Sequence, residues 1–347
     1  MRRREFLAGT VGAAAALGLG RVVRGQTARQ PDPAKLARIA IMTYNFNGIL
    51  KLPNQPPSAA RTLDILDVPQ MLADTYGVHN VEFQHTHVAS TEESYLRTLR
   101  ARLDQAQSRM TNVNLEFGTS NISAADPADR EKAVEMTKAW IDYAPILGTP
   151  RVMINQGALT EDSKVWAIPT LKRMVEYGRS KGIKVSVETR LTPGAGARGR
   201  GAAPTGVAPG AAAPGAAAAA PPPAVAPTSA ADGGAPGTNA AAGPVPMMTE
   251  APTWVLLAEL IKNAGAWSNV DIGNVNAQDQ GELHAALRTL LPMTVGNIHT
   301  RISPAFDLPT ALRFIDANLG YQGLFSIEAP AGHDAVRYIY NVILDTI

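Results

Sequence analysis

Four side chains that can bind a divalent metal follow short apolar segments in the second half of this 347-residue sequence. Glu188 ends Val-Ser-Val-Glu, Asp271 lies in Val-Asp-Ile-Gly, His299 follows Asn-Ile, and Glu328 follows Ser-Ile. Three carboxylates and one imidazole form a hard, mostly oxygen site that suits Mn²⁺, Mg²⁺ or Co²⁺, and Zn²⁺ also fits. Because the chain has no Cys, thiolate metal sites and disulfides are excluded.

Each of these side chains also has an ordinary structural explanation. A Glu at a strand end often pairs with a loop cation, and Asp271 can form an Asx turn before Gly273. His299 can be a hydrogen-bonded core imidazole, and Glu328 can face solvent after its strand. The metal site is favoured for the set as a whole. Burying three carboxylates without partners is very unfavourable, and a metal removes that difficulty.

The strand and helix pattern predicts how these side chains are positioned. Short segments rich in β-branched residues and bounded by Gly, Asn or Pro are expected to be strands. They are 38–46, 78–84, 111–118, 150–155, 183–188, 268–273, 293–299 and 323–328. Helical patterns lie at 65–76, 90–108, 126–147, 164–181, 252–264, 280–290, 308–319 and 333–346. This alternation predicts an α/β fold, a (β/α)8 TIM barrel, in which all strand ends meet at one rim.

A doubly wound open sheet is the competing architecture. It usually has a Gly-rich loop after the first strand, and the segment Thr-Tyr-Asn-Phe-Asn-Gly-Ile-Leu at 43–50 has no such loop. Helix ends carry local signals as well. The segment 90–108 begins Ser-Thr-Glu-Glu, which predicts a capping box. The segment 126–147 begins Asp-Pro, and Lys-Gly follows Ser180, which predicts a helix end there.

A Gly/Ala/Pro-rich tract at 192–247 interrupts the barrel pattern after the fifth strand. Its composition cannot bury a core, so we expect a disordered insert in the fifth strand-to-helix loop. Such loops lie at the catalytic end of a barrel. A domain boundary is the alternative, but it would leave four strands on each side, and neither half would close. The barrel domain is therefore expected to span 36–347.

The first 30 residues have the layout of an export signal. A basic start is followed by an apolar stretch from Phe6 to about Gly20, too short to span a bilayer. Arg-Arg-Glu-Phe-Leu at 3–7 matches the core of the twin-arginine signal. We therefore expect a periplasmic or other extracytoplasmic protein that meets the membrane only during export or through an uncleaved signal. A formal net charge of +2 argues against nucleic-acid binding, which needs a concentrated basic face.

The strand-end residues resemble those of the xylose isomerase-like TIM-barrel superfamily of sugar and sugar-phosphate isomerases and epimerases. The resemblance covers 36–347 outside the insert. It depends on Gly-Ile-Lys-Val-Ser-Val-Glu at 182–188, Val-Asp-Ile-Gly-Asn at 270–274, His299, and Gly-Leu-Phe-Ser-Ile-Glu at 323–328. In the ketose 3-epimerase branch, Glu, Asp, His and Glu hold one divalent metal. The resemblance thus implies a single ion, Mn²⁺ above all, held by Glu188, Asp271, His299 and Glu328.

The resemblance also implies a reaction. A metal bound to adjacent oxygens of a hydroxy-ketone acidifies the C–H bond beside the carbonyl, and two carboxylates act as base and acid. Those catalytic roles go to Glu188 and Glu328. We predict an isomerase or epimerase with a small carbohydrate substrate. Two alternatives remain open: a lyase or eliminase acting on a keto-glycoside, and a non-catalytic exported sugar-binding barrel.

Several positions depart from the family pattern. The family often has Glu-x-His at strand five and His-x-Lys-Asp at strand seven, where this chain has Glu-Thr-Arg190 and His-Thr-Arg301-Ile. Arg190 and Arg301 are candidates for substrate binding, and surface charges are the alternative for both. Asn274 is a further candidate. It stands where a three-zinc DNA-repair nuclease branch has a His, which argues against that activity.

Strand two adds two further candidates for substrate binding. His85 and His87 follow the strand and, two residues apart, would share one of its faces. A solvated loop is the alternative for both. Glu82, within the same strand, occupies a position that is commonly Glu in the family, so we expect it to support the metal ligands from behind.

Overall fold

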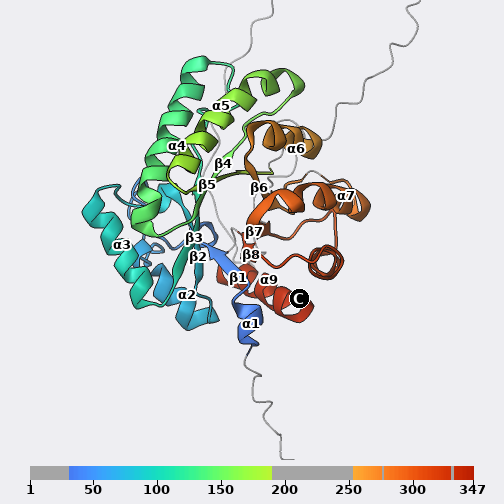
Figure 1. Ribbon diagram of the computed structural model, residues 1–347. Helices are drawn as coiled ribbons and strands as arrows, with labels where there is room; N and C mark the ends of the chain where they lie inside the picture. Colours follow the sequence, from blue (N-terminus) through green and yellow to red (C-terminus); the bar gives the residue numbers. More distant parts are fainter. Residues whose placement is uncertain (1–30, 190–252, 276, 330–331) are drawn as a thin grey trace, which may run out of the picture.

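The structure, a computed structural model, describes residues 31–189, 253–275, 277–329 and 332–347. Eight parallel strands form a closed barrel in chain order, and β1 pairs with β8 to complete it (Figure 1). The predicted (β/α)8 barrel is therefore confirmed. The strands are β1 Ile39–Met42, β2 Asn80–Gln84, β3 Arg109–Leu115, β4 Arg151–Asn155, β5 Lys184–Glu188, β6 Trp267–Asp271, β7 Thr294–Thr300 and β8 Leu324–Ile327.

Helices surround the barrel on its outside (Figure 1). They are α1 Pro33–Leu36, α2 Val68–Tyr76, α3 Glu93–Gln105, α4 Pro127–Leu147, α5 Glu161–Ser180, α6 Thr253–Ala264, α7 Gln280–Leu290, α8 Leu308–Arg313 and α9 His333–Thr346. The pattern at 308–319 is only partly α-helical, because a π-helical turn (η5, Phe314–Asn318) follows α8. The first predicted strand is shorter than expected, since the 3₁₀ turn Thr43–Phe46 (η1) follows β1.

Helix capping agrees with the sequence at α4 and differs at α3. Asp126 caps α4 by accepting a hydrogen bond from Ala128 N–H, and Pro127 is its first residue, as expected. The capping box predicted for α3 is wrong. Ser90 Oγ accepts a hydrogen bond from Glu92 N–H, so the helix begins only at Glu93 and its N-cap has no side-chain bond.

The outward faces of the strands form the main hydrophobic core. In β2 and β3, Val81, Phe83, Val113 and Leu115 are buried among the helices, while the residues between them are polar. This alternation follows from the pleat, which sends successive side chains to opposite faces. One face therefore packs on helices, and the other lines the barrel interior.

The barrel interior is unusually polar. Arg151 of β4 reaches across to β7, where its Nη1 donates to Val295 O at 2.9 Å, and its Nε donates to Thr111 O at 2.7 Å. Above it, Asn112, Glu82 and Asn297 form a buried hydrogen-bonded layer. Because hydrogen bonds inside a barrel are shielded from water, such a layer holds the polar groups above it in place.

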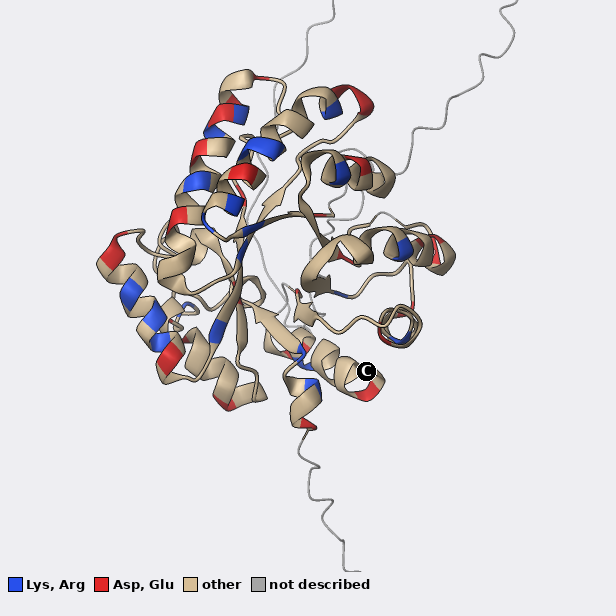
Figure 2. Ribbon diagram, viewed as in Figure 1, with Lys and Arg blue, Asp and Glu red and all other residues tan. Residues whose placement is uncertain are grey.

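Three expectations concern residues outside the described part of the chain: the export signal at 1–30, the insert at 192–247, and Arg190. Within the described residues, no helix is both long enough and apolar enough to cross a membrane. Acidic and basic residues are interspersed along the outer helices, for example on α3, α4 and α5 (Figure 2).

Candidate active site

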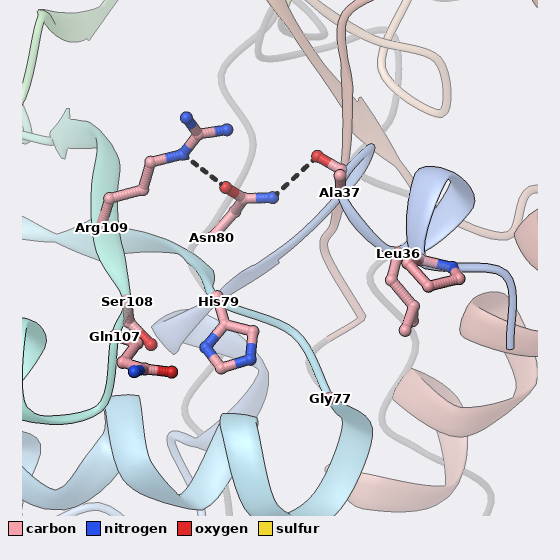
Figure 3. A pocket seen from close by; sticks show the side chains of 9 residues that line it. Leu36, Ala37, Gly77, His79, Asn80, Gln107, Ser108 and Arg109 are labelled. Atoms are coloured by element: carbon pink, nitrogen blue, oxygen red, sulfur yellow. Dashed lines mark hydrogen bonds between the residues drawn. The ribbon is translucent and has the colours of Figure 1, made fainter. Parts of the chain in front are cut away.

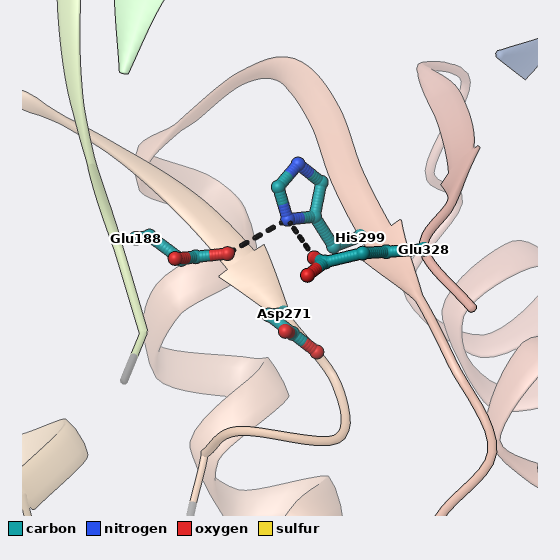
Figure 4. A group of neighbouring side chains, drawn as sticks. All are labelled: Glu188, Asp271, His299 and Glu328. Atoms are coloured by element: carbon teal, nitrogen blue, oxygen red, sulfur yellow. Dashed lines mark hydrogen bonds and ion pairs between the residues drawn. The ribbon is translucent and has the colours of Figure 1, made fainter. Parts of the chain in front are cut away.

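The structure brings the four strand-end residues together at the carboxyl end of the barrel. Glu188 ends β5, Asp271 ends β6, His299 lies in β7 beside Asp271, and Glu328 follows β8. One ligand atom from each lies within 4.8 Å of the others, and all four side chains are buried (Figure 4). The barrel accounts for this convergence, because its parallel strands end on one rim.

His299 is oriented by carboxylates on both sides of its ring. Its Nδ1 lies 2.8 Å from Glu188 Oε1 and 2.9 Å from Glu328 Oε2, and its Nε2 lies 2.7 Å from Glu82 Oε1. Burial would lower the pKa of His299, but the charge of Glu82 and the hydrogen bonds with Glu188, Glu328 and Glu82 outweigh it and raise the pKa well above 6.5, so both ring nitrogens donate to carboxylates. If His299 held a metal, it would lose the Nδ1 proton, while Glu82 would still accept the Nε2–H and so direct the Nδ1 lone pair into the cluster. This is the arrangement by which a carboxylate commonly fixes the tautomer of a metal-binding histidine.

Glu82 is the centre of the buried layer beneath the cluster. Besides His299, its oxygens accept hydrogen bonds from Asn112 Nδ2 at 2.8 Å, Asn297 Nδ2 at 3.1 Å and Ser326 Oγ at 2.5 Å. Burial alone would raise the pKa of Glu82, but the charge of His299 and these hydrogen bonds outweigh it and lower the pKa to about 2. Glu82 is thus a fixed negative charge.

Sequence reasoning found Glu82 but missed its three other donors. Asn112, Asn297 and Ser326 are fully or almost fully buried. Their one sequence signal is an inward position in the alternation of β3, β7 and β8.

Asp271 is held by its own loop. Its Oδ1 accepts from Gly273 N–H at 2.9 Å, and its Oδ2 accepts from Asn274 Nδ2 at 2.6 Å. The Asx turn considered above is therefore present, and it coexists with a place in the cluster. Thr189 adds a further restraint, since its Oγ1 accepts from Asp271 N–H at 2.7 Å.

Arg301 belongs to the cluster. Its Nη2 lies 2.7 Å from Asp271 Oδ2 and also contacts Glu328 Oε1. The alternative of a surface charge is therefore wrong for Arg301, whose side chain is only 24% exposed. Its position directly after β7 turns it towards the same rim as His299.

The local charges act differently on the three carboxyl groups. Burial raises the pKa of Asp271 to about 7, and burial followed by the charge of Glu328 raises the pKa of Glu188. Burial also acts on Glu328, but Arg301 and His299 outweigh it and lower its pKa to about 2. The pKa values of the two glutamates that flank His299 are thus shifted in opposite directions: that of Glu188 is raised and that of Glu328 is lowered.

The donor set fits a divalent metal. Glu328 Oε2 is buried, and among the described residues it forms only an ion pair, at 2.9 Å from His299 Nδ1, while the hydrogen bond of that nitrogen goes to Glu188. A buried carboxylate oxygen left in this way is costly unless a cation meets it. Three carboxylates and one imidazole Nδ1 are donors that Mn²⁺ and Mg²⁺ accept. Glu188, Asp271, His299 and Glu328 are therefore the residues that would hold the ion.

The two histidines after β2 do not lie as expected. They form the 3₁₀ turn η3 (His85–His87), so they do not share a strand face, and His87 is buried rather than solvated. Thr43 Oγ1 accepts Gln84 N–H and lies 2.9 Å from His87 Nδ1, to which its hydroxyl can donate. Burial lowers the pKa of His87 to about 4, so the ring is neutral at pH 7. His85 packs edge-on against Phe117 and Trp140.

A pocket of about 490 Å³ lies at the opposite end of the barrel (Figure 3). It is lined by the start of β2 and β3 together with α1, and Arg109 Nε donates to Asn80 Oδ1 at 2.7 Å across it. Asn80 Nδ2 in turn donates to Ala37 O at 3.1 Å. In TIM barrels this end serves stability, so we assign the candidate active site to the carboxylate cluster.

Comparisons with known proteins agree with this architecture. The model of the xylose isomerase-like TIM barrel family matches residues 71–198. No curated protein sequence matches the chain significantly. A 3-keto-D-glucoside 4-epimerase from E. coli has a similar structure, with a TM-score of 0.57 and 10% identity over 89% of this chain and 99% of that one.

Two other solved structures are similar to a comparable degree. A D-psicose 3-epimerase from Clostridium cellulolyticum H10, solved with D-tagatose, has a TM-score of 0.55 and 11% identity, covering 89% of this chain and 94% of that one. A xylose isomerase-like TIM barrel protein from Mycobacterium smegmatis in complex with magnesium has a TM-score of 0.55 and 15% identity, covering 90% and 98%. The chain therefore shares the TIM-barrel fold of these proteins, and its residues 71–198 match the xylose isomerase-like family.

Proposed function

We propose that this chain belongs to the xylose isomerase-like family and is a divalent-metal-dependent isomerase or epimerase. Its substrate would be a sugar or sugar derivative, and its reaction a proton transfer at the carbon beside a carbonyl. The fold and the family match at 71–198 support the general class. The named activities of the epimerases with similar structures are consistent with the reaction.

One observation carries the proposal. Glu188 and Glu328 approach His299 Nδ1 from two sides, and Asp271 completes the group from below (Figure 4). Two buried carboxylates that flank one cation site can reach a bound substrate from different directions. That is the requirement for removing a proton on one face of a carbon and returning it on the other.

Each of these residues has a separate role in the proposed reaction. When bound, the metal supplies positive charge that acidifies the C–H bond beside the substrate carbonyl. Glu188 and Glu328 serve as base and acid, in an order that depends on the direction of the reaction. Asp271 and His299 hold the ion, and Glu82 keeps His299 in the tautomer that presents Nδ1. Expulsion of a β-leaving group after the same proton removal would instead make the enzyme a lyase.

The test is proton exchange. Purified protein loaded with Mn²⁺ is incubated in D₂O with a panel of ketoses and 3-keto-glycosides, and products are followed by NMR. We expect deuterium beside the carbonyl together with an epimer or isomer. Glu188→Gln and Glu328→Gln should each lower the rate by about 100-fold or more, the usual contribution of a general acid or base. Glu131→Gln, which changes an exposed carboxylate, should leave the rate unchanged.

The other outcomes distinguish the alternatives. An unsaturated product with loss of a substituent would identify a lyase. Saturable sugar binding without any deuterium exchange would favour a non-catalytic binding barrel. Exchange that persists in both glutamine variants would show that other groups transfer the proton.

A further inference from the structure

Arg301 provides a positive charge inside the carboxylate cluster. A single nitrogen, Nη2, contacts both Asp271 Oδ2, at 2.7 Å, and Glu328 Oε1. Asp271 is fully buried, so this ion pair is largely shielded from water. Removing one partner of such an ion pair is strongly destabilising, because the other charge stays buried without compensation.

Gly273 makes room for this contact. A Cβ at residue 273 would lie 2.3 Å from Arg301 Cγ and 2.4 Å from its Cδ. Gly273 is not in the left-handed region, so its backbone does not require a glycine. Its function here is space: the absence of a side chain lets the stem of Arg301 pass along the loop after β6 and reach the cluster.

The cluster contains three carboxylates that two cations would share. Asp271 and Glu328 are among the four residues that would hold a divalent ion, and both already contact the guanidinium. Two positive charges that neutralise the same oxygens repel each other strongly at these distances and weaken each other's binding. Such coupling is reciprocal, so each cation lowers the benefit of the other.

We infer that Arg301 sets the metal affinity of this site by competing with the divalent ion for Asp271 and Glu328. Full use of these oxygens by a divalent ion would require the guanidinium to give up its contacts with Asp271 and Glu328. The inference depends on the metal site proposed above. It adds a residue that stabilises the metal-free protein and limits how tightly the ion is held.

Mn²⁺ titration by calorimetry, together with thermal unfolding in EDTA and in Mn²⁺, tests this inference without a substrate. Arg301→Met should bind Mn²⁺ roughly 5- to 150-fold more tightly than wild type, the usual range of such couplings. It should also have a lower Tm in EDTA and a larger Tm gain on adding Mn²⁺. Gly273→Ala keeps every charge but obstructs the arginine stem, so it should change both quantities in the same direction and by less.

A matched control is Arg38→Met. Arg38 forms an ion pair with Asp316 at 2.6 Å, has a side chain exposed to 20%, and also donates to the backbone oxygens of Tyr321 and Gly323, just before β8. It lies at the other end of the barrel, so its loss should lower the Tm equally in EDTA and in Mn²⁺ and leave the Mn²⁺ affinity unchanged.

Other results would overturn the inference in distinguishable ways. Equal Mn²⁺ affinity in wild type, Arg301→Met and Gly273→Ala would show that Arg301 is only structural. Weaker binding by both variants would show that Arg301 positions the ligands instead of competing with the metal. If neither wild type nor the variants bound Mn²⁺, Mg²⁺ or Co²⁺, the metal site itself, and the proposed function with it, would be wrong.

Discussion

Replacing Glu82 by Gln tests the buried layer that supports the active site. The two side chains have nearly the same shape, but one oxygen becomes an amide NH₂. Each Glu82 oxygen accepts two hydrogen bonds, Oε1 from Asn112 and His299, and Oε2 from Asn297 and Ser326. Whichever way the new amide turns, its NH₂ therefore faces two donors, and the negative charge beside His299 is lost.

The structure allows the cost to be worked out in two ways. Two hydrogen bonds to a charged group, each contributing about 1.5–3 kcal/mol and partly relieved because the Ser326 hydroxyl can rotate, give a loss of about 3 kcal/mol. The pKa of Glu82, about 2 against an ordinary value of 4.5, also corresponds to about 3 kcal/mol. Because this pKa is lowered on folding, the stabilisation is complete above pH 4.5 and is lost as the pH falls towards 2.

Urea unfolding at pH 7 in the presence of EDTA measures this loss. The free energy of unfolding of Glu82→Gln should be about 3 kcal/mol below wild type, which for a chain of this size lowers the Tm by roughly 6–12 °C. Affinity for Mn²⁺ should fall about 10- to 100-fold, because the tautomer of His299 is no longer fixed. Glu131→Gln is the matched control: this exposed carboxylate pairs with Arg173, and its replacement should leave both quantities nearly unchanged.

A Glu82→Gln variant as stable as wild type would refute the reasoning, since it would mean that Glu82 is not the charged acceptor of four donors. A destabilised variant with unchanged Mn²⁺ affinity would refute only the link from Glu82 through His299 to the metal.

Three further predictions follow from particular residues. The pKa of His87 is lowered from 6.5 in the unfolded chain to about 4 in the folded protein. As the pH falls from 6.5 towards 4, the unfolded chain therefore binds a proton that the folded protein does not, and the free energy of unfolding decreases. Between pH 6.5 and 5 wild type should lose about 1.5 kcal/mol from this group, and His87→Gln should lack that loss in urea unfolding at the two pH values. Mn²⁺ at about 100 times its Kd should stabilise wild type by about 2.7 kcal/mol, and Asp271→Asn should abolish most of the accompanying Tm shift. Replacing 192–247 by a short Gly-Ser linker should leave stability and Mn²⁺ binding nearly unchanged, because loop-closure entropy grows slowly with length, and lost binding would contradict this.

The barrel and the residues at its rim were predictable from local patterns. Short β-branched segments alternating with helical ones predict eight strands in chain order, and the structure has them in that order. Glu188, Asp271, His299 and Glu328 were recognisable because each is a polar residue at the end of an apolar strand. Parallel strands in a closed barrel bring such ends together whatever the details of packing.

The contacts of those residues depended on the folded barrel. His299 meets Glu188 111 positions away and Glu82 217 positions away, and no local pattern in the sequence reports such pairings. Arg301 illustrates the same limit, since an arginine after a strand reads as a surface charge until Gly273 is seen to open its path to Asp271. Both faces of a barrel strand are buried, so burial does not separate the helix-facing residues from those that line the interior. Only the closed barrel determines which polar side chains meet inside it, because their hydrogen bonds join strands that the sequence keeps far apart.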